Sequence, residues 1–175
     1  MSSLKSYHIT NHYLDASALV KLVVDDADDE RGRDILREYF WQRRGFSHAT
    51  SFSIAEALSV FKRKFSRGKI TEAEYIRHVR DFIRMTSNNL QIVEVPVLST
   101  IVLDEAEKIV KTHKIDFLDA FQIVTIIQGK FRVFGSESTI LITADSGLAK
   151  AARAKNVRVW DCTSEPAPDH LEELT

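Results

Sequence analysis

Two hydrophobic periods alternate along the chain. Apolar side chains at helical spacing predict helices at 18–24, 31–44, 53–65, 71–86, 99–113, 116–128 and 146–154. Short apolar or alternating runs predict strands at 12–14, 46–49, 90–95, 139–143 and 157–160. Because strands and helices alternate from end to end, this order favours an α/β fold, a three-layer α/β/α sandwich with a central parallel sheet.

Capping signals define where these helices begin. Ser17 is the predicted N-cap of the first helix, and Ser51 or Ser53 caps the helix that runs to 65. Thr71 and Glu74 have the spacing of a capping box, in which each side chain bonds the backbone N–H of the other residue.

The length of the chain, 175 residues, fits one domain with a sizeable core. The apolar share of 44% is ordinary for a globular protein. Trp41 and Trp160 are expected to pack in its core, and the alternative is stacking on nucleobases. No internal repeat or low-complexity block marks a linker. We therefore expect a single domain at 1–163, followed at 164–175 by an acidic tail that is a flexible end or a docking segment.

The charge balance limits how this protein can bind other molecules. With 24 basic and 25 acidic residues the net charge is −1, so a nucleic acid must be bound through a local patch or a metal. The one cysteine, Cys162, excludes an intrachain disulfide and a cysteine-based zinc site, and it suits a reducing cytosol. The polar N-terminal residues lack the layout of a signal peptide, and no apolar run reaches the length of a membrane span. The expected location is the cytoplasm.

Two acidic residues follow predicted strands. Asp15 comes at the end of the first strand, and Asp145 follows the buried-strand pattern TILIT. In a parallel sheet covered on both faces, ligands bind outside the carboxyl ends of the strands, so both side chains are candidates for one crevice. The alternative for each is a plain N-cap of the helix that follows.

Three further acids stand in or beside helices. Glu56 has apolar neighbours near a helix start, where it can also simply complement the helix dipole. Asp119 lies inside the apolar helix DFLDAFQIV, where an ionised carboxylate is costly unless it is paired or bound to a metal. Asp116 is one turn earlier and is the expected N-cap of that helix.

Carboxylates gathered in one crevice repel each other, and a divalent cation relieves the repulsion. An all-oxygen donor set favours Mg²⁺ or Mn²⁺ over zinc. Such a site supports phosphoryl transfer, in which the metal activates water and stabilises charge on the phosphate. The sequence has no Ser-His-Asp or Cys-His arrangement and no phosphate-binding Gly-rich loop, so other hydrolases and P-loop NTPases are disfavoured.

Four blocks of sequence resemble the PIN domain family. They are YLDASALVKL at 13–22, SIAEALSVFKRK at 53–64, DFLDAFQIVT at 116–125 and LITADSGLAKAA at 141–152. The blocks occur in the family order, span nearly the whole chain and each carry an acid in place. The sequence is therefore similar to PIN domains, including the VapC-type toxin ribonucleases.

This resemblance implies a function and a site. It implies Mg²⁺- or Mn²⁺-dependent cleavage of RNA by a toxin of a type II toxin–antitoxin pair, with a small antitoxin as partner and a homodimer as assembly. The implied catalytic metal ligands are Asp15, Glu56, Asp119 and Asp145. The groups implied to orient these carboxylates or a water are Ser17, Thr143 and Asp116.

A basic run follows Glu56 directly. Lys62, Arg63, Lys64 and Arg67 are candidates for contacts to an RNA backbone, and the alternative is a solvated helix face. Phosphate contacts of this kind confer affinity without sequence choice.

Two other functions remain open. One is a PIN-type nuclease of RNA processing without a toxin role, and the other is a non-catalytic binding module such as a receiver-like domain. A receiver has adjacent acids after its first strand. Asp25 and Asp26 are adjacent but follow a helix, which counts against that alternative.

Overall fold

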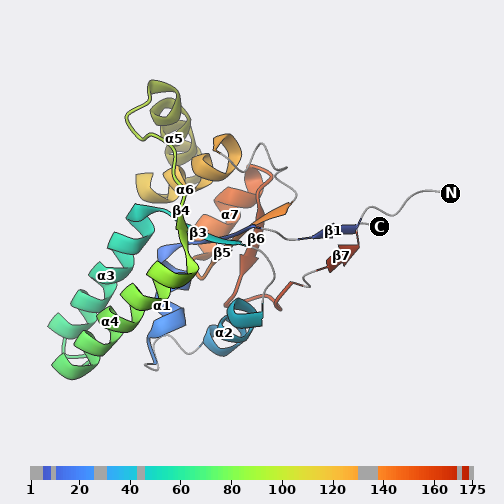
Figure 1. Cartoon of the computed structure of the whole chain (residues 1–175). Coiled ribbons are helices and arrows are strands. Elements are labelled where there is room, and N and C mark those ends of the chain that lie inside the picture. Colours follow the sequence, from blue (N-terminus) through green and yellow to red (C-terminus); the bar gives the residue numbers. More distant parts are fainter. Residues whose placement is uncertain are drawn as a thin grey trace.

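A parallel sheet of five strands forms the centre of the computed structural model, with helices on both of its faces (Figure 1). The structure describes residues 6–8, 11–25, 31–42, 46–129, 138–168 and 171–173. Across the sheet the strands follow the order β4 (Gln91–Ile92), β3 (Phe46–Ala49), β2 (Asn11–Leu14), β5 (Thr139–Thr143) and β6 (Arg158–Asp161). The predicted α/β/α sandwich with a central parallel sheet is confirmed.

Helices cover the two faces of the sheet separately. One face carries α1 (Ala16–Val23), α2 (Arg33–Gln42), α3 (Ser51–Ser66) and α4 (Glu72–Asn89), and the other carries α5 (Thr100–His113), α6 (Phe117–Gln128) and α7 (Ser146–Ala154). Side chains alternate along a strand, so Leu14 and Ile142 pack under the first group, while their neighbours Tyr13 and Leu141 pack under the second. All of β5 is buried, as expected for an interior strand of a parallel sheet.

The chain order creates a topological switch point at the middle of the sheet, and the region outside the carboxyl ends of β2 and β5 is here called the crevice. From β2 the chain moves outwards to β3 and β4, and it then returns through α5 and α6 to pair β5 with the other side of β2. The helices that follow β2 and β5 therefore leave towards opposite faces. Such a switch point is where α/β sheets bind ligands, outside the carboxyl ends of the strands.

Two predicted helix caps are wrong by a few residues. Asp15, not Ser17, caps α1 and accepts from the backbone of the third helical residue. Thr50, not Ser51 or Ser53, caps α3 in the same way. In both cases the helix begins directly after the strand, so the residue at the strand end takes the cap. The capping box predicted for α4 is confirmed.

The structure also corrects one predicted strand and one predicted core residue. The predicted strand at 90–95 is paired only at Gln91–Ile92. Trp160 is buried as predicted, but Trp41 is 63% exposed, because Leu36, Tyr39 and Phe40 take the buried face of α2.

Part of the segment after β6 packs on the domain, where Ala167 contacts the hydrophobic core. The indole N–H of Trp160 donates to the backbone oxygen of Glu165 at 3.2 Å. Farther on, β7 (Leu171–Glu173) pairs antiparallel with β1 (Ser6–His8). Residues 169–170 and 174–175 of the predicted tail lie outside the described residues, and the domain limits of 1–163 and 164–175 stay a prediction. No helix within the described ranges is long and apolar enough to cross a membrane.

Candidate active site

Asp15 lies at the carboxyl end of β2, inside the crevice. Its carboxylate accepts from the backbone N–H of Ala18 at 2.8 Å, which makes it the N-cap of α1. The Ser17 hydroxyl donates to both carboxylate oxygens at 2.8 and 2.9 Å, and the Thr143 hydroxyl donates at 2.7 Å. Burial raises the pKa of Asp15 to about 6, against the opposing effect of these hydrogen bonds, and the charge of Asp145 raises it further.

Thr143 and Ser17 connect Asp15 to the start of α7. The Thr143 hydroxyl accepts from the backbone N–H of Asp145 at 2.9 Å, and the Ser17 hydroxyl accepts from that of Ala144 at 2.8 Å. The Asp145 carboxylate caps α7 by accepting from two backbone N–H groups of its first turn, at 2.7 and 2.9 Å. The structure thus brings together Asp15, Ser17, Thr143 and Asp145, and the simple capping role foreseen as an alternative is real for both aspartates.

Asp119 approaches the same crevice from α6. Asp116 is the N-cap of this helix, as predicted, and accepts from the backbone N–H of Asp119 at 2.9 Å. Burial is the main reason that the pKa of the Asp119 carboxyl rises to about 7. Negative charge on other carboxylates raises it further, namely Asp116, Asp145, Asp15 and Glu56. The predicted acids are therefore near enough to act on one another electrostatically.

Glu56 lies in the second turn of α3, because that helix begins at Ser51 rather than Ser53. A helix dipole acts mainly within the first turn, so dipole stabilisation explains less of this position than expected. Burial raises the pKa of Glu56, and the charges of Asp116 and Asp145 raise it further, while Arg63 lowers it. Glu56 is therefore coupled electrostatically to acids at the starts of α6 and α7.

The donor set fits a hard divalent cation by its chemistry. All the donors are carboxylate or hydroxyl oxygens, and the pKa shifts show that the carboxylates repel each other. Within the described residues, no three His, Cys, Asp or Glu side chains already stand close enough together to enclose a metal. A carboxylate offers about four acceptor positions. Asp15 accepts four such contacts, one from Ala18, one from Thr143 and two from the single Ser17 hydroxyl, so a metal bound to Asp15 would share or displace the Ser17 contact.

A family model of the PIN domain matches residues 12–154. The chain belongs to the PIN domain family. Among solved structures, the crystal structure of PAE2754 from Pyrobaculum aerophilum has the same fold, with a TM-score of 0.55 and 16% identity over 86% of this chain and 90% of that chain. A search of curated proteins found no match. PIN domains are generally nucleases that act with divalent metals, and the resemblance predicted from the four blocks is confirmed at the level of the family.

The basic run of this PIN domain divides between two faces of α3. Arg63 follows Glu56 by seven residues, a spacing that places both on one side of the helix, whereas Arg67 is the C-cap just after the last residue of α3. The Lys62 ammonium lies elsewhere, over the rings of Phe65 and Tyr75 at 5.0 and 5.8 Å from their centroids. Lys64 is half-buried on the same helix. An RNA-binding role for these four residues stays a prediction.

A pocket of about 260 Å³ lies beside Ser17, whose hydroxyl connects Asp15 to the start of α7. Its walls come from α1, α3 and the loops after β5 and β6, and the lining residues are Ser17, Val20, Lys21, Val60, Ala144 and Thr163. Lys21 is buried there, 6% exposed. Sequence reasoning missed it, because a lysine at the end of a short amphipathic helix has the pattern of a solvated residue.

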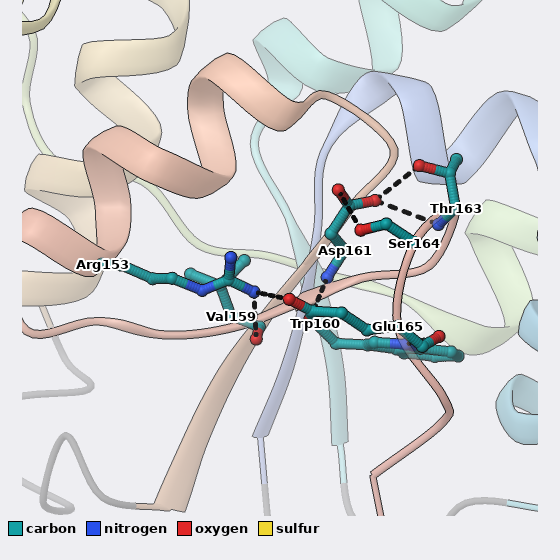
Figure 2. Close-up of polar contacts among 7 residues, drawn as sticks. All are labelled: Arg153, Val159, Trp160, Asp161, Thr163, Ser164 and Glu165. Atoms are coloured by element: carbon teal, nitrogen blue, oxygen red, sulfur yellow. Dashed lines mark hydrogen bonds and ion pairs between the residues drawn. The ribbon is translucent and has the colours of Figure 1, made fainter.

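Asp161 is a further acid at the carboxyl edge of the PIN sheet that sequence reasoning missed. It ends β6, and Figure 2 shows its carboxylate turned towards Thr163 and Ser164. It accepts from the Thr163 N–H and hydroxyl at 3.0 and 2.6 Å and from the Ser164 hydroxyl at 2.7 Å. Burial alone would raise the pKa of Asp161, but these hydrogen bonds outweigh it and hold the pKa below its usual value. The carboxylate of Asp161 stabilises this turn by accepting three hydrogen bonds.

Replacing Asp161 with alanine is expected to destabilise the fold by about 2 kcal/mol, because three donors lose a buried acceptor. Urea unfolding with an unchanged m-value measures this loss. The control is Asp104→Ala at an exposed position of α5, where the free energy of unfolding should change by no more than about 0.5 kcal/mol. Equal stability of the two variants would contradict the structural role of Asp161.

Proposed function

We propose that this PIN domain is a Mg²⁺- or Mn²⁺-dependent endoribonuclease. The observation that carries the proposal is the position of Asp15 and Asp145 after the paired strands β2 and β5, where the hydroxyl groups of Ser17 and Thr143 join them. Glu56 and Asp119 are coupled electrostatically to this pair. A protein does not gather like charges at one edge without a cost in stability, and a bound cation offsets that cost. The family assignment supports a nuclease, while RNA as substrate and the metal ligands belong to the proposal.

We propose Asp15, Glu56, Asp119 and Asp145 as the groups that hold the cation. When bound, the metal supplies Lewis-acid stabilisation of the phosphate and an activated water. Ser17 and Thr143 orient Asp15 through their hydroxyl groups, and Asp116 adds negative charge beside Asp119.

Contacts to the RNA backbone are proposed for the basic residues of α3. The geometry favours Arg63, which shares the side of the helix that carries Glu56, and Arg67 follows at the C-cap. A guanidinium pairs with phosphate in a bidentate way, so Arg63 can position a phosphate next to the metal ligands. Lys62 and Lys64 add positive charge to the same helix and steer the polyanion towards it.

The biological role that we propose is that of a VapC-type toxin in the cytoplasm, paired with a small antitoxin and assembled as a homodimer. Support comes from the four sequence blocks in family order, YLDASALVKL to LITADSGLAKAA. A neighbouring gene that encodes a small DNA-binding protein, and copurification of its product with this chain, would separate a toxin from a housekeeping nuclease.

The nuclease proposal is tested by incubating purified protein with a pool of structured RNAs in Mg²⁺, in Mn²⁺ and in EDTA. Cleavage is expected with either metal and not with EDTA, and adding metal back should restore it. Product ends mapped within the chains would establish an endonuclease. Cleavage that persists in EDTA would contradict metal dependence, and intact RNA under all conditions would contradict the nuclease.

A further inference from the structure

The pocket beside Ser17 has a cation in its wall. Lys21 lines it from the last turn of α1 and is only 6% exposed. Lysine is among the residue types that are least often buried, because its ammonium loses solvation there. The apolar part of the wall consists of Val20, Val60 and Ala144. The pocket therefore combines a positive charge with apolar walls, between which a charge interaction is stronger than in water.

Hydrogen bonds within the chain fix two walls of this pocket. The Arg37 guanidinium donates to the backbone oxygens of Lys21 and Val24 at 3.0 and 2.9 Å, which holds the end of α1. On another wall, Thr163 donates to Asp161 through its N–H and its hydroxyl, at 3.0 and 2.6 Å. A ligand therefore does not have to order these walls when it binds.

The pocket follows the proposed metal ligands along two neighbouring helices. On α1, Asp15 is the cap, Ser17 donates to it, and Lys21 comes one helical turn after Ser17. On α3, Val60 follows Glu56 by four residues, so both lie on one side of that helix. The two helices pack against each other, and each begins directly after a strand of the sheet. On both helices an acid of the proposed site comes first and a residue of the pocket comes next.

Size and charge limit what the pocket can hold. Its volume of about 260 Å³ is below the range of about 300–1,000 Å³ that is usual for small-molecule sites, so it suits one group of a larger molecule. Lys21 offsets the acids nearby, because its charge lowers the pKa of Cys162, whereas the charges of Asp15 and Asp161 raise it. An ammonium has three N–H donors, so Lys21 can keep contacts within the protein and still bind an anion.

We propose that this pocket is a subsite for one phosphate group of the RNA, which the ammonium of Lys21 binds next to the phosphate that is cleaved. The inference rests on the proposed ribonuclease function and deepens it. The cleaved phosphate lies at the proposed ligands Asp15 and Glu56, and a neighbouring phosphate of the same strand lies at Lys21. Holding a second phosphate fixes the strand relative to the acids, which supports catalysis by orientation, and it does so without reading the base sequence.

Four variants test the subsite. Lys21→Met removes the charge and keeps a long, apolar side chain. Val60→Glu places a carboxylate in the wall of the pocket, and Val60→Gln is its neutral match in size. Lys111→Met, at an exposed position of α5 on the other face of the sheet, is the control for the loss of a lysine. Circular dichroism checks that each variant folds.

Binding of a phosphate group is measured first, without metal or RNA. In EDTA, urea midpoints are compared in inorganic phosphate and in chloride of equal ionic strength, since a ligand that binds only the folded chain stabilises it. Phosphate also stabilises proteins in general, so the readout is the difference between variants. The gain in midpoint is expected to be larger for wild type and Lys111→Met than for Lys21→Met, and larger for Val60→Gln than for Val60→Glu.

The second measurement locates the phosphate on the RNA by metal-dependent cleavage. Each backbone phosphate in turn is replaced by an uncharged methylphosphonate. One replacement beside the cut should raise KM for wild type but hardly for Lys21→Met, which has already lost that contact. On unmodified RNA, Lys21→Met should show a KM about tenfold higher, because a charged hydrogen bond is lost. The slope of log KM against log salt concentration should fall by about 0.7–0.9, the contribution of one phosphate contact.

The outcomes separate this proposal from the ribonuclease function. If phosphate stabilises wild type and Lys21→Met equally and no methylphosphonate distinguishes them, the subsite is wrong, while RNA cleavage by wild type leaves the nuclease standing. If phosphate favours wild type but the methylphosphonate series does not, the pocket binds free phosphate and its assignment to RNA is wrong. If wild type gains more from phosphate than Lys21→Met but cleaves no RNA with Mg²⁺ or Mn²⁺, the ribonuclease function fails and only an anion site remains.

Discussion

Replacing Asp119 with asparagine is expected to reduce metal-dependent RNA cleavage by about 10²- to 10³-fold, while the metal-free protein becomes more stable. The activity loss follows from removing one proposed metal ligand, since a metal contributes several kcal/mol to the transition state and each 1.36 kcal/mol is a factor of ten. The gain in stability follows because burial and four neighbouring carboxylates disfavour the charge of Asp119.

The gain is expected to be about 1–2 kcal/mol at pH 8, since Asp119 is only partly buried and solvent screens its interactions. Cleavage assays and urea unfolding in EDTA measure the two effects on the same samples. Asp104→Asn, at an exposed position of α5, is the matched control and should change neither. A stability loss in Asp119→Asn together with unaltered cleavage would remove Asp119 from the site.

The second large effect is a change of sign in the pH dependence of stability when metal is added. The pKa values of Asp15 and Asp119 are raised from 3.8 to about 6 and about 7 in the folded chain. Between about pH 4 and 7 the folded chain therefore binds more protons than the unfolded chain, and its stability falls as the pH rises. Over this pH range Asp15, which is fully buried, is expected to lower the free energy of unfolding by about 2–3 kcal/mol. Asp119, whose interactions solvent screens, lowers it by about 1 kcal/mol more.

Other carboxyls act in the opposite direction. Hydrogen bonds from Arg37 and Lys155 hold the pKa values of Asp25 and Glu105 below their usual range, and their contribution is lost as the pH falls below about 4. The metal-free protein is therefore expected to be most stable near pH 4–5. With saturating Mg²⁺ the trend above pH 5 should reverse, because protons compete with the metal for the same oxygens.

Urea midpoints between pH 5 and 8, in EDTA and in Mg²⁺, measure both trends. Asp119→Asn should flatten both curves, since it removes one titrating group and one ligand. Equal stability at pH 5 and pH 8 in EDTA would mean that folding does not disfavour the ionised form of these carboxylates. A curve that Mg²⁺ leaves unchanged would show that the acids bind no metal.

Much of this protein was predictable from local patterns. The alternation of strands and helices was predictable because the spacing of apolar residues within each segment differs between the two. The sandwich follows from the order of these elements. The carboxyl-edge placement of Asp15 and Asp145 also follows, since each comes directly after a strand. The short contacts of the α4 capping box depend on Thr71 and Glu74 alone, and the box forms as predicted.

Local patterns were less informative where neighbouring residues compete for the same helix cap or buried position. The starts of α1 and α3 were misplaced because several residues in a row can cap a helix, and the strand end decides which of them does. Trp41 was expected inside, but its place on α2 turns it outwards once Tyr39 and Phe40 are buried. The extent of β4 depends on its pairing with β3, which involves Gln91 and Ile92 alone.

The site itself needed the tertiary structure. The hydrogen bond between Thr143 and Asp15 joins residues 128 positions apart, and it exists only because β5 pairs with β2. Asp161 stabilises a turn through its hydrogen bonds, and burial with neighbouring carboxylates raises the pKa of Asp119. Both effects depend on groups that only the folded chain brings together. The sequence by itself determined which acids stand at element ends. Only the tertiary structure decided which of them share a crevice, because electrostatic coupling depends on distance through space and not along the chain.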